Sequence, residues 1–351
     1  MRRGIVPPYL LTQLANLDRE DLREAAEAAR RALASEFPNH PTRPTALPTQ
    51  IPTPTEPSSP DRTVSDAHNT ETLPGTVVRR EGDSPTGDQA ADEAYDGLGA
   101  TYALFAEAFG RASIDGAGLP LLASVHYGSN YDNAFWDGGQ MVFGDGDGLV
   151  FGRFTASLSV IGHELAHGVT QHSANLAYEG QSGALNESVS DVFGALVEQH
   201  ALQQNVDQAT WLIGEGIFTD QVEGNALRSM KAPGTAYDDD VLGKDPQPGH
   251  MDNYIETTDD NGGVHLNSGI PNKAFHLTAI ALGGNAWESA GEIWYQTLIG
   301  DLPTTATFAD FAAATAMTAA DRFGEGSTEH KAVLDAWSTV GLPIGDTGTD
   351  G

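Results

Sequence analysis

The amino-acid sequence predicts an α+β protein with a β-rich N-terminal lobe, a mainly α-helical C-terminal lobe and a small segment in front of both. Two observations support this division. Short runs rich in valine and aromatic residues, bounded by glycine and aspartate, precede residue 155, whereas apolar residues recur at helical spacing after it. A proline-rich stretch, residues 38–62, holds eight of the 19 prolines and separates the first residues from the rest.

We expect five parts along the chain. A small N-terminal segment, residues 1–37, contains an amphipathic helix and is joined to the main body by a flexible linker, residues 38–62. The body consists of a β-rich lobe, residues 63–155, and a helical lobe, residues 156–345, which begins with a histidine-containing helix at the junction. Residues 346–351 are expected to be a disordered tail.

The composition argues against several classes of function. The 351 residues include 49 acidic and 18 basic side chains, a formal net charge of -31, which repels nucleic acid and anionic membranes. Without cysteine, any bound metal must use nitrogen and oxygen ligands. No apolar run reaches membrane-spanning length and the N-terminus is not a standard signal peptide, so we expect a cytoplasmic protein, with non-classical secretion as the alternative. The acidic surface fits either a high-salt habitat or a composition bias.

Two histidines stand four residues apart in the sequence HELAH. On a helix this spacing places His163 and His167 one turn apart on one face, where both imidazoles reach one ion, and Glu164 beside them, near a metal-bound water. A second helical stretch, NESVSD, supplies Glu187 as a third ligand and Asp191, which is placed to orient a ligand histidine. The pattern predicts a catalytic zinc site with a glutamate base.

These motifs, together with NAFWDGGQMVFGDGDG, LRSM and DNGGVHLNSGIPNKAF, resemble those of the thermolysin-type zinc metalloproteases. The N-terminal sequence IVPPYLL is similar to the protealysin-like branch, which carries a short propeptide. The resemblance covers residues 63–345 and this N-terminal segment. It implies a β-rich lobe, a helical lobe and the zinc helix between them. It also implies a neutral endopeptidase that acts on proteins and peptides and is made as a self-inhibited precursor.

The same resemblance assigns catalytic partners. His265, oriented by Asp260, and Tyr178 would stabilise the negative charge that develops on the substrate's carbonyl oxygen. Without the resemblance, the residue pattern alone would favour an ordinary surface-loop histidine at His265.

Substrate-binding residues also follow from the resemblance. Asn133 and Ala134 would pair with the substrate backbone as an edge strand, and Arg228 would bind a substrate carbonyl. An apolar pocket would accept the side chain that follows the cut bond, so that cleavage falls on the amino side of hydrophobic residues. Its walls would be Phe151, Phe154, Val160, Ile213, Ile217 and Leu227.

A calcium site is expected at Glu198, Asp207 and Glu215, whose hard oxygens suit this ion. The chain departs from the family pattern nearby, because Ser159 stands where relatives commonly have an acidic calcium ligand, and the paired calcium site of the family is in doubt. GDGDG at 144–148 is interpreted as a tight turn, with calcium binding as the alternative.

Residues 1–37 are interpreted as an inhibitory propeptide, with an unrelated partner-binding arm as the alternative. The prolines of IVPPYLL would hold this segment extended in the cleft beside the zinc. We expect the enzyme to cut itself near Arg62–Val64, where Val64 suits the apolar pocket. Two rival functions stay open, a zinc aminopeptidase and a catalytically inactive, zinc-stabilised peptide-binding module. A monomer is expected.

Overall fold

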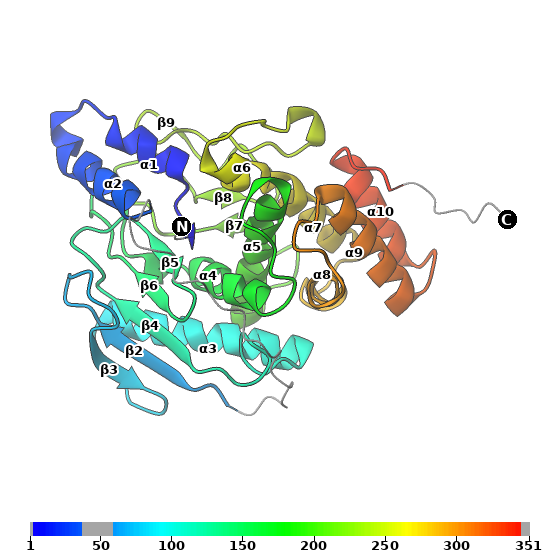
Figure 1. Cartoon of the computed structure of the whole chain (residues 1–351), viewed down its shortest axis with the longest axis horizontal. Helices are drawn as coiled ribbons and strands as arrows, with labels where there is room; N and C mark the ends of the chain where they lie inside the picture. The colour runs from blue at the N-terminus through cyan, green and yellow to red at the C-terminus, as the bar shows by residue number, and fades with distance from the viewer. Residues whose placement is uncertain (1–2, 37–58, 345–351) are drawn as a thin grey trace.

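The computed structural model describes residues 3–36 and 59–344, which form a small N-terminal unit and two lobes (Figure 1). The predicted linker falls mainly on residues 37–58, and the predicted tail falls within residues 345–351. Both lie outside the described part of the chain. The α+β prediction is confirmed, with strands concentrated before residue 150 and helices after it.

The N-terminal unit, residues 3–36, is a short strand followed by a helical hairpin. β1 (Arg3–Gly4) leads into α1 (Pro8–Ala15), and the chain returns through η1 (Glu20–Leu22) and α2 (Arg23–Glu36), which packs against α1. Pro8 can begin α1 because the N–H group of the first helical residue has no acceptor within the helix, so a residue that lacks this group loses no hydrogen bond there. The expected extended conformation therefore ends at Pro7, and the rest of IVPPYLL is helical.

A six-stranded sheet forms the core of the first lobe. Its order is β1-β5-β6-β4-β2-β3, so the N-terminal unit adds an edge strand to the main body. β1 runs antiparallel to β5, with Arg3 opposite Trp136 and Gly4 opposite Phe135. Helix α3 (Gln89–Phe109) packs against the sheet. The other strands are β2 (Arg62–Asp66), β3 (Thr76–Arg80), β4 (Leu121–Val125), β5 (Ala134–Trp136) and β6 (Met141–Phe143).

The second lobe is helical, with α4 at the junction between the lobes (Figure 1). The helices are α4 (Leu158–Gln171), α5 (Gly180–Leu202), α6 (Asp260–Asn267), α7 (Gly269–Leu282), α8 (Ser289–Ile299), α9 (Phe308–Phe323) and α10 (Thr328–Thr339), with short 3-10 turns η2 (Phe154–Ala156) and η3 (Met251–Asn253). Two small hairpins lie between α5 and α6, made of β7 (Leu212–Ile213) with β8 (Arg228–Ser229), and β9 (Asp238–Asp239) with β10 (Gly243–Lys244). None of the helices in the described ranges combines the length and apolar character needed to cross a bilayer.

Helices α4 and α5 approach closely, and this contact positions the site. Gly194 of α5 faces α4 so tightly that a Cβ atom there would lie 2.4 Å from the carbonyl oxygen of Ser159. A Cβ atom on Gly162 would similarly lie 3.0 Å from the Cα of Gly194. Because side chains are absent at this crossing, the two helices carry their polar residues within reach of one another.

The structure makes the expected self-cleavage near Arg62–Val64 unfavourable, because these residues lie within the sheet. These residues open β2, which pairs with β3 on one side and with β4 on the other, and Val64 is fully buried. The backbone of Asp61 is also bonded to the sheet, because its carbonyl oxygen accepts a hydrogen bond from the backbone N–H of Leu121 in β4 at 2.7 Å. A peptidase needs an accessible strand, so a cut that frees the N-terminal unit must fall earlier in the chain.

Candidate active site

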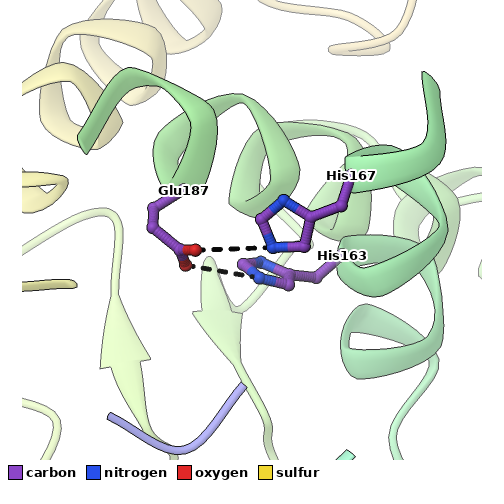
Figure 2. Close-up of side chains that lie close together, drawn as sticks. All are labelled: His163, His167 and Glu187. Atoms are coloured by element: carbon purple, nitrogen blue, oxygen red, sulfur yellow. Dashed lines mark ion pairs between the residues drawn. The ribbon is translucent and has the colours of Figure 1, made fainter. Parts of the chain in front are cut away.

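His163, His167 and Glu187 converge between α4 and α5 (Figure 2). Their ligand atoms all lie within 4.8 Å of one another. Nε2 of His163 and Nε2 of His167 each stand 3.4 Å from an oxygen of Glu187, and all three side chains are buried. Helical spacing explains the geometry, because the histidines are one turn apart on α4 and α5 presents the carboxylate opposite them.

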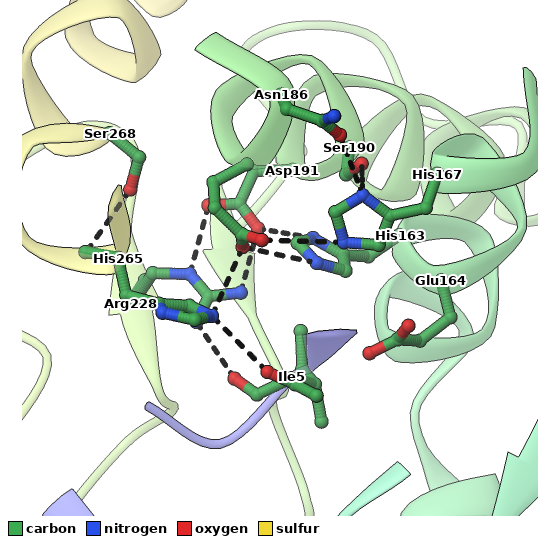
Figure 3. Close-up of polar contacts among 12 residues, drawn as sticks. Ile5, His163, Glu164, His167, Asn186, Ser190, Asp191, Arg228, His265 and Ser268 are labelled. Carbon is green, nitrogen blue, oxygen red and sulfur yellow. Dashed lines mark hydrogen bonds and ion pairs between the residues drawn. The ribbon is translucent and has the colours of Figure 1, made fainter. Parts of the chain in front are cut away.

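The outer nitrogen of each histidine is held by α5 (Figure 3). Nδ1 of His163 donates to Oδ1 of Asp191 at 2.7 Å. Nδ1 of His167 donates to Oδ1 of Asn186 at 2.8 Å, with Oγ of Ser190 3.0 Å away. Because both Nδ1 atoms act as donors, both Nε2 atoms keep their lone pairs for the space between the helices.

The donor set fits a zinc ion. Within the described ranges, Nε2 of His163 and Oε2 of Glu187 are buried atoms with no hydrogen-bond partner, an arrangement that is costly unless a further group satisfies them. Two imidazoles and one carboxylate are a recognised set for catalytic zinc, which leaves a fourth position open. These three residues would therefore hold the ion. They are also the only group of three such side chains that converges in the part of the chain that the structure describes.

Glu164 lies next to the ligands but faces the sheet. Its Oε2 accepts the backbone N–H of Trp136 in β5 at 2.9 Å, while Oε1 has no hydrogen-bond partner among the described residues. Burial raises the pKa of Glu164 to about 8, although the neighbouring His163 opposes the shift. A carboxyl group whose pKa is near neutrality is suited to accept and release a proton.

His265 and Tyr178 flank the other side of the site. The Asp260 carboxylate accepts both the backbone N–H of His265, at 2.8 Å, and its ring Nδ1–H, at 2.7 Å. Burial lowers the pKa of His265, but Asp260 and Glu187 outweigh it and raise the pKa to about 10, so the ring is a charged donor. The hydroxyl of Tyr178 lies 3.3 Å from Nε2 of His265 and also donates to Glu187.

Arg228 is fully buried and anchored to α5. Its Nε and Nη2 donate to the two oxygens of Asp191 at 2.9 and 2.8 Å. Nδ2 of Asn272 donates to the same carboxylate at 2.8 Å. Although burial opposes ionisation, Arg228 and His163 hold the pKa of Asp191 down to about 2. Asp191 thus joins His163 to Arg228, a double role that the sequence did not reveal.

The remaining donor of Arg228 points to the N-terminal unit (Figure 3). Its Nη1 donates to the carbonyl oxygen of Ile5 at 3.0 Å, and the backbone N–H of Ile5 donates to the carbonyl oxygen of Ala134 at 3.0 Å. The carbonyl oxygen of Gly4 lies 3.2 Å from Nε2 of His265. We call residues 3–6 the docked segment, because they lie along β5 and contact Arg228 and His265.

Asn133 contacts the next residue of the docked segment. Its Oδ1 accepts the backbone N–H of Val6 at 2.9 Å, and its Nδ2 lies 3.5 Å from the carbonyl oxygen of Val6. Ile5 and Val6 are fully buried. The residues expected to bind a substrate backbone, Asn133, Ala134 and Arg228, therefore all bind the chain's own N-terminus in this conformation.

The other predicted residues divide into two groups. The residues expected to line the apolar pocket are all buried in one hydrophobic cluster: Phe151, Phe154, Val160, Ile213, Ile217 and Leu227. Of the expected calcium ligands, Glu198 and Glu215 lie close enough that the charge of Glu215, in addition to burial, raises the pKa of Glu198. Asp207 does not join them in a converging group of three within the described ranges.

Some contacts at the site were not anticipated. Asn186 and Ser190, which orient His167, stand one turn apart on α5 at the spacing of a shared helix face, and this spacing was the available signal. The backbone N–H of Trp136 that binds Glu164 had no signal in the sequence, because any residue supplies such a group.

Comparisons with known proteins agree with this geometry. Residues 55–171 match the catalytic domain of the thermolysin metallopeptidases, and residues 174–342 match their α-helical domain. An extracellular metalloprotease of Pectobacterium carotovorum subsp. carotovorum is 50% identical over 342 residues, covering 97% of this chain and 96% of that protein. A thermolysin of Alicyclobacillus acidocaldarius subsp. acidocaldarius is 40% identical, covering 79% of this chain and 50% of that protein.

A solved structure is similar over nearly the whole chain. It is the precursor of protealysin, a metalloproteinase from Serratia proteamaculans, with a TM-score of 0.88 and 51% identity, and the match covers 97% of this chain and 99% of that one.

The expectation of a cytoplasmic protein is wrong. The Pectobacterium relative, which matches 97% of this chain, is named an extracellular metalloprotease, and this points to an extracellular protein. The lack of a standard signal peptide does not decide where a protein acts. From the two matched domains and the full-length relatives, the chain belongs to the thermolysin family of metallopeptidases, in its protealysin-like branch.

Proposed function

We propose that this metalloendopeptidase binds one catalytic zinc through His163, His167 and Glu187 and is kept inactive by its own N-terminal unit. The observation that carries the proposal is the docked segment, whose backbone uses the hydrogen-bonding groups that a substrate would need. The full-length match to a metalloproteinase precursor supports it. Release of the N-terminal unit would open the cleft to protein and peptide substrates.

The contacts of the docked segment suggest how a substrate lies. The Gly4 carbonyl faces His265, so the Gly4–Ile5 bond corresponds to the bond that would be cut. Arg3, before this bond, pairs with Trp136, and Val6, after it, binds Asn133. Because the site engages residues on both sides of the bond, the arrangement favours an endopeptidase over an aminopeptidase, which needs a closed end for a free amino group.

The residues of the site supply an acid–base mechanism. Bound zinc would polarise the attacking water and the scissile carbonyl. Glu164 takes a proton from the water as the water oxygen adds to the carbonyl carbon, and delivers a proton to the nitrogen as the C–N bond breaks. His265 and Tyr178 stabilise the negative charge on the carbonyl oxygen as donors. The presence of all three residues argues against an inactive peptide-binding module.

Cleavage is expected on the amino side of Leu, Phe, Ile or Val. Ile5, which marks the position directly after the cut bond, is fully buried. An apolar pocket at this position favours a substrate by about 1–3 kcal/mol of binding free energy for each methylene group that fills it. Mass spectrometry of a protein digested by the activated enzyme would identify the cut bonds. A dominant cut after Lys or Arg would contradict the proposed pocket.

Replacing Gly4 with Val should weaken inhibition. A Cβ atom at position 4 would lie 2.4 Å from Nδ2 of Asn133, whose amide is buried and already bonded to Val6. A side chain there must displace Asn133 or push the docked segment away from β5. We expect the full-length Gly4→Val precursor to cleave casein faster than the wild-type precursor, measured before any processing as judged by mass.

Thr12→Val is a suitable control for Gly4→Val, because it also changes the N-terminal unit but at an exposed position of α1. It should keep the latency of the wild type. Equal latency in Gly4→Val and wild type would show that the tight contact with Asn133 does not maintain inhibition.

We also propose a calcium site at Glu198 and Glu215; the third predicted ligand, Asp207, does not converge with them within the described ranges. Burial and the negative charge of Glu215 raise the pKa of Glu198. A bound cation would relieve the repulsion between these two carboxylates, and this supports the proposed site. Calcium should therefore raise the melting temperature of the wild type but not that of Glu198→Gln. An equal response of both proteins would place the calcium effect elsewhere. A monomeric enzyme stays a prediction.

A further inference from the structure

Asp132 carries a carboxyl group that the acid–base mechanism of Glu164 does not use. It directly precedes Asn133 in the chain, and its side chain is fully buried. Within the described ranges neither oxygen of this carboxyl group has a hydrogen-bond partner. An ionised carboxylate in such a place is costly, so the group is expected to be neutralised.

The backbone on either side of Asp132 is paired with the turn that follows β6. The carbonyl oxygen of Asn133 accepts the backbone N–H of Gly144 at 3.0 Å, and that of Tyr131 accepts the backbone N–H of Gly146 at 3.2 Å. These two hydrogen bonds hold Asp132 against the sequence GDGDG, residues 144–148.

Asp147 lies in this turn and has one oxygen to spare. Its Oδ1 accepts the backbone N–H groups of residues 149, 150 and 151 at 2.7, 2.7 and 3.1 Å, which closes the turn. Its Oδ2 is buried and has no hydrogen-bond partner in the part of the chain that the structure describes. Asp145, the other acid of the turn, is bonded to Nδ1 of His126 at 2.8 Å. Oδ2 of Asp147 is therefore the oxygen available to Asp132.

Two ionised carboxylates cannot bond to one another, because each only accepts hydrogen bonds. Burial raises the pKa of Asp132 well above its ordinary value, and the negative charge of Asp147 and a hydrogen bond between the two side chains add to the rise. The nearby backbone N–H of Asp147 and the positive charge of Arg31, in α2 of the N-terminal unit, oppose it. A proton retained on Asp132 supplies the donor that the pair lacks.

We propose that Asp132 donates this proton in a hydrogen bond to Oδ2 of Asp147 and thereby positions Asn133 for the substrate backbone. The proposal rests on the proposed function, in which Asn133 binds the substrate. Asp132 is a positioning residue, because it acts through Asn133. When the proton is lost, two buried negative charges repel each other and the start of β5 separates from the turn. Substrate binding then weakens as the pH rises.

The first test compares wild type and Asp132→Asn as activated enzymes, with a short peptide that carries leucine after the cut bond. Asn at position 132 keeps a donor for Asp147 at every pH. The wild-type KM divided by that of Asp132→Asn at the same pH should rise about three- to tenfold as the pH increases, the effect of one lost hydrogen bond, while the ratio of the kcat values stays near one. Because both proteins are measured at the same pH, the titration of other groups cancels.

Asp321→Asn is the matched control, because it removes an exposed carboxylate from α9. Its KM should follow that of the wild type at every pH. A KM ratio for Asp132→Asn that does not change with pH would overturn the proposal. Lack of any peptide cleavage by the wild type would instead count against the proposed function.

The second test measures thermal unfolding of the full-length Glu164→Gln precursor and needs no activity. Because the pKa of Asp132 is raised in the folded protein, its contribution to stability is complete below the pKa of the unfolded chain, about 3.9, and is lost as the pH rises through the folded pKa. Asp132→Asn should therefore gain at least about 2 °C in melting temperature over its parent as the pH rises. Asp147→Asn should gain similarly, since its amide can donate to an ionised Asp132. A difference from the parent that is independent of pH in both variants would contradict a shared proton.

A cation in place of the proton is distinguished by adding calcium. The Glu198→Gln protein, which lacks one carboxylate of the proposed calcium site, serves as the background. Calcium should leave its melting temperature unchanged whether residue 132 is Asp or Asn. A rise with calcium that Asp132→Asn abolishes would show that the pair of carboxyl groups binds a metal ion, and the proposal would fall.

Discussion

Replacing Glu164 with Gln should leave the metal bound and lower casein turnover by about 10²- to 10⁴-fold, the usual contribution of a positioned acid–base group. Gln keeps the size of the side chain and can still accept the N–H of Trp136, so the fold around β5 should be unchanged. It cannot take a proton from water. Zinc content and casein cleavage should be measured on the same sample of activated protein.

Glu325→Gln provides the control for this substitution, because it removes an exposed carboxylate after α9, in the C-terminal part of the helical lobe. It should keep both zinc and activity. Wild-type-like cleavage by Glu164→Gln would remove this residue from the catalytic role, even if the metal were fully bound.

Glu187→Ala should lose the metal together with the activity. Glu187 provides the carboxylate of the group formed with His163 and His167, and α5 offers no replacement oxygen because Asp191 is engaged by Arg228, His163 and Asn272. Two histidines alone make an incomplete site for catalytic zinc. Metal analysis after dialysis would measure the loss, with thermal unfolding to verify that the variant is folded. Full zinc occupancy in Glu187→Ala would exclude this residue as a ligand.

Periodicity in the sequence was sufficient to predict the geometry of the metal site. The spacing of His163 and His167 fixes one helix face, and a second helix had only to bring Glu187 opposite. Helical spacing is a local property, so it survives without knowledge of the rest of the fold. The close approach of α4 and α5 depends on the packing of Gly194 against α4. No local pattern in the sequence reveals this contact.

Other features depended on contacts between distant segments. Val64 looked like an accessible cleavage point because the sequence does not show that β2 pairs on both edges. The register of the docked segment follows from the backbone carbonyl groups of Gly4 and Ile5 and the backbone N–H of Val6. Because nearly every residue supplies such groups, the sequence carries no signal for this register. The prediction of a cytoplasmic location was wrong for a different reason. Export depends on targeting signals, and the physical rules of folding do not identify these.

In the proposed function, metal-dependent peptide hydrolysis takes place at the site that the docked segment occupies. Casein digestion by activated wild-type protein, first treated with a chelator and then given back zinc, measures this dependence on the metal. Digestion should stop on chelation, return with zinc, and yield fragments that begin with hydrophobic residues. Digestion that continues at the wild-type rate in the metal-free protein would contradict it.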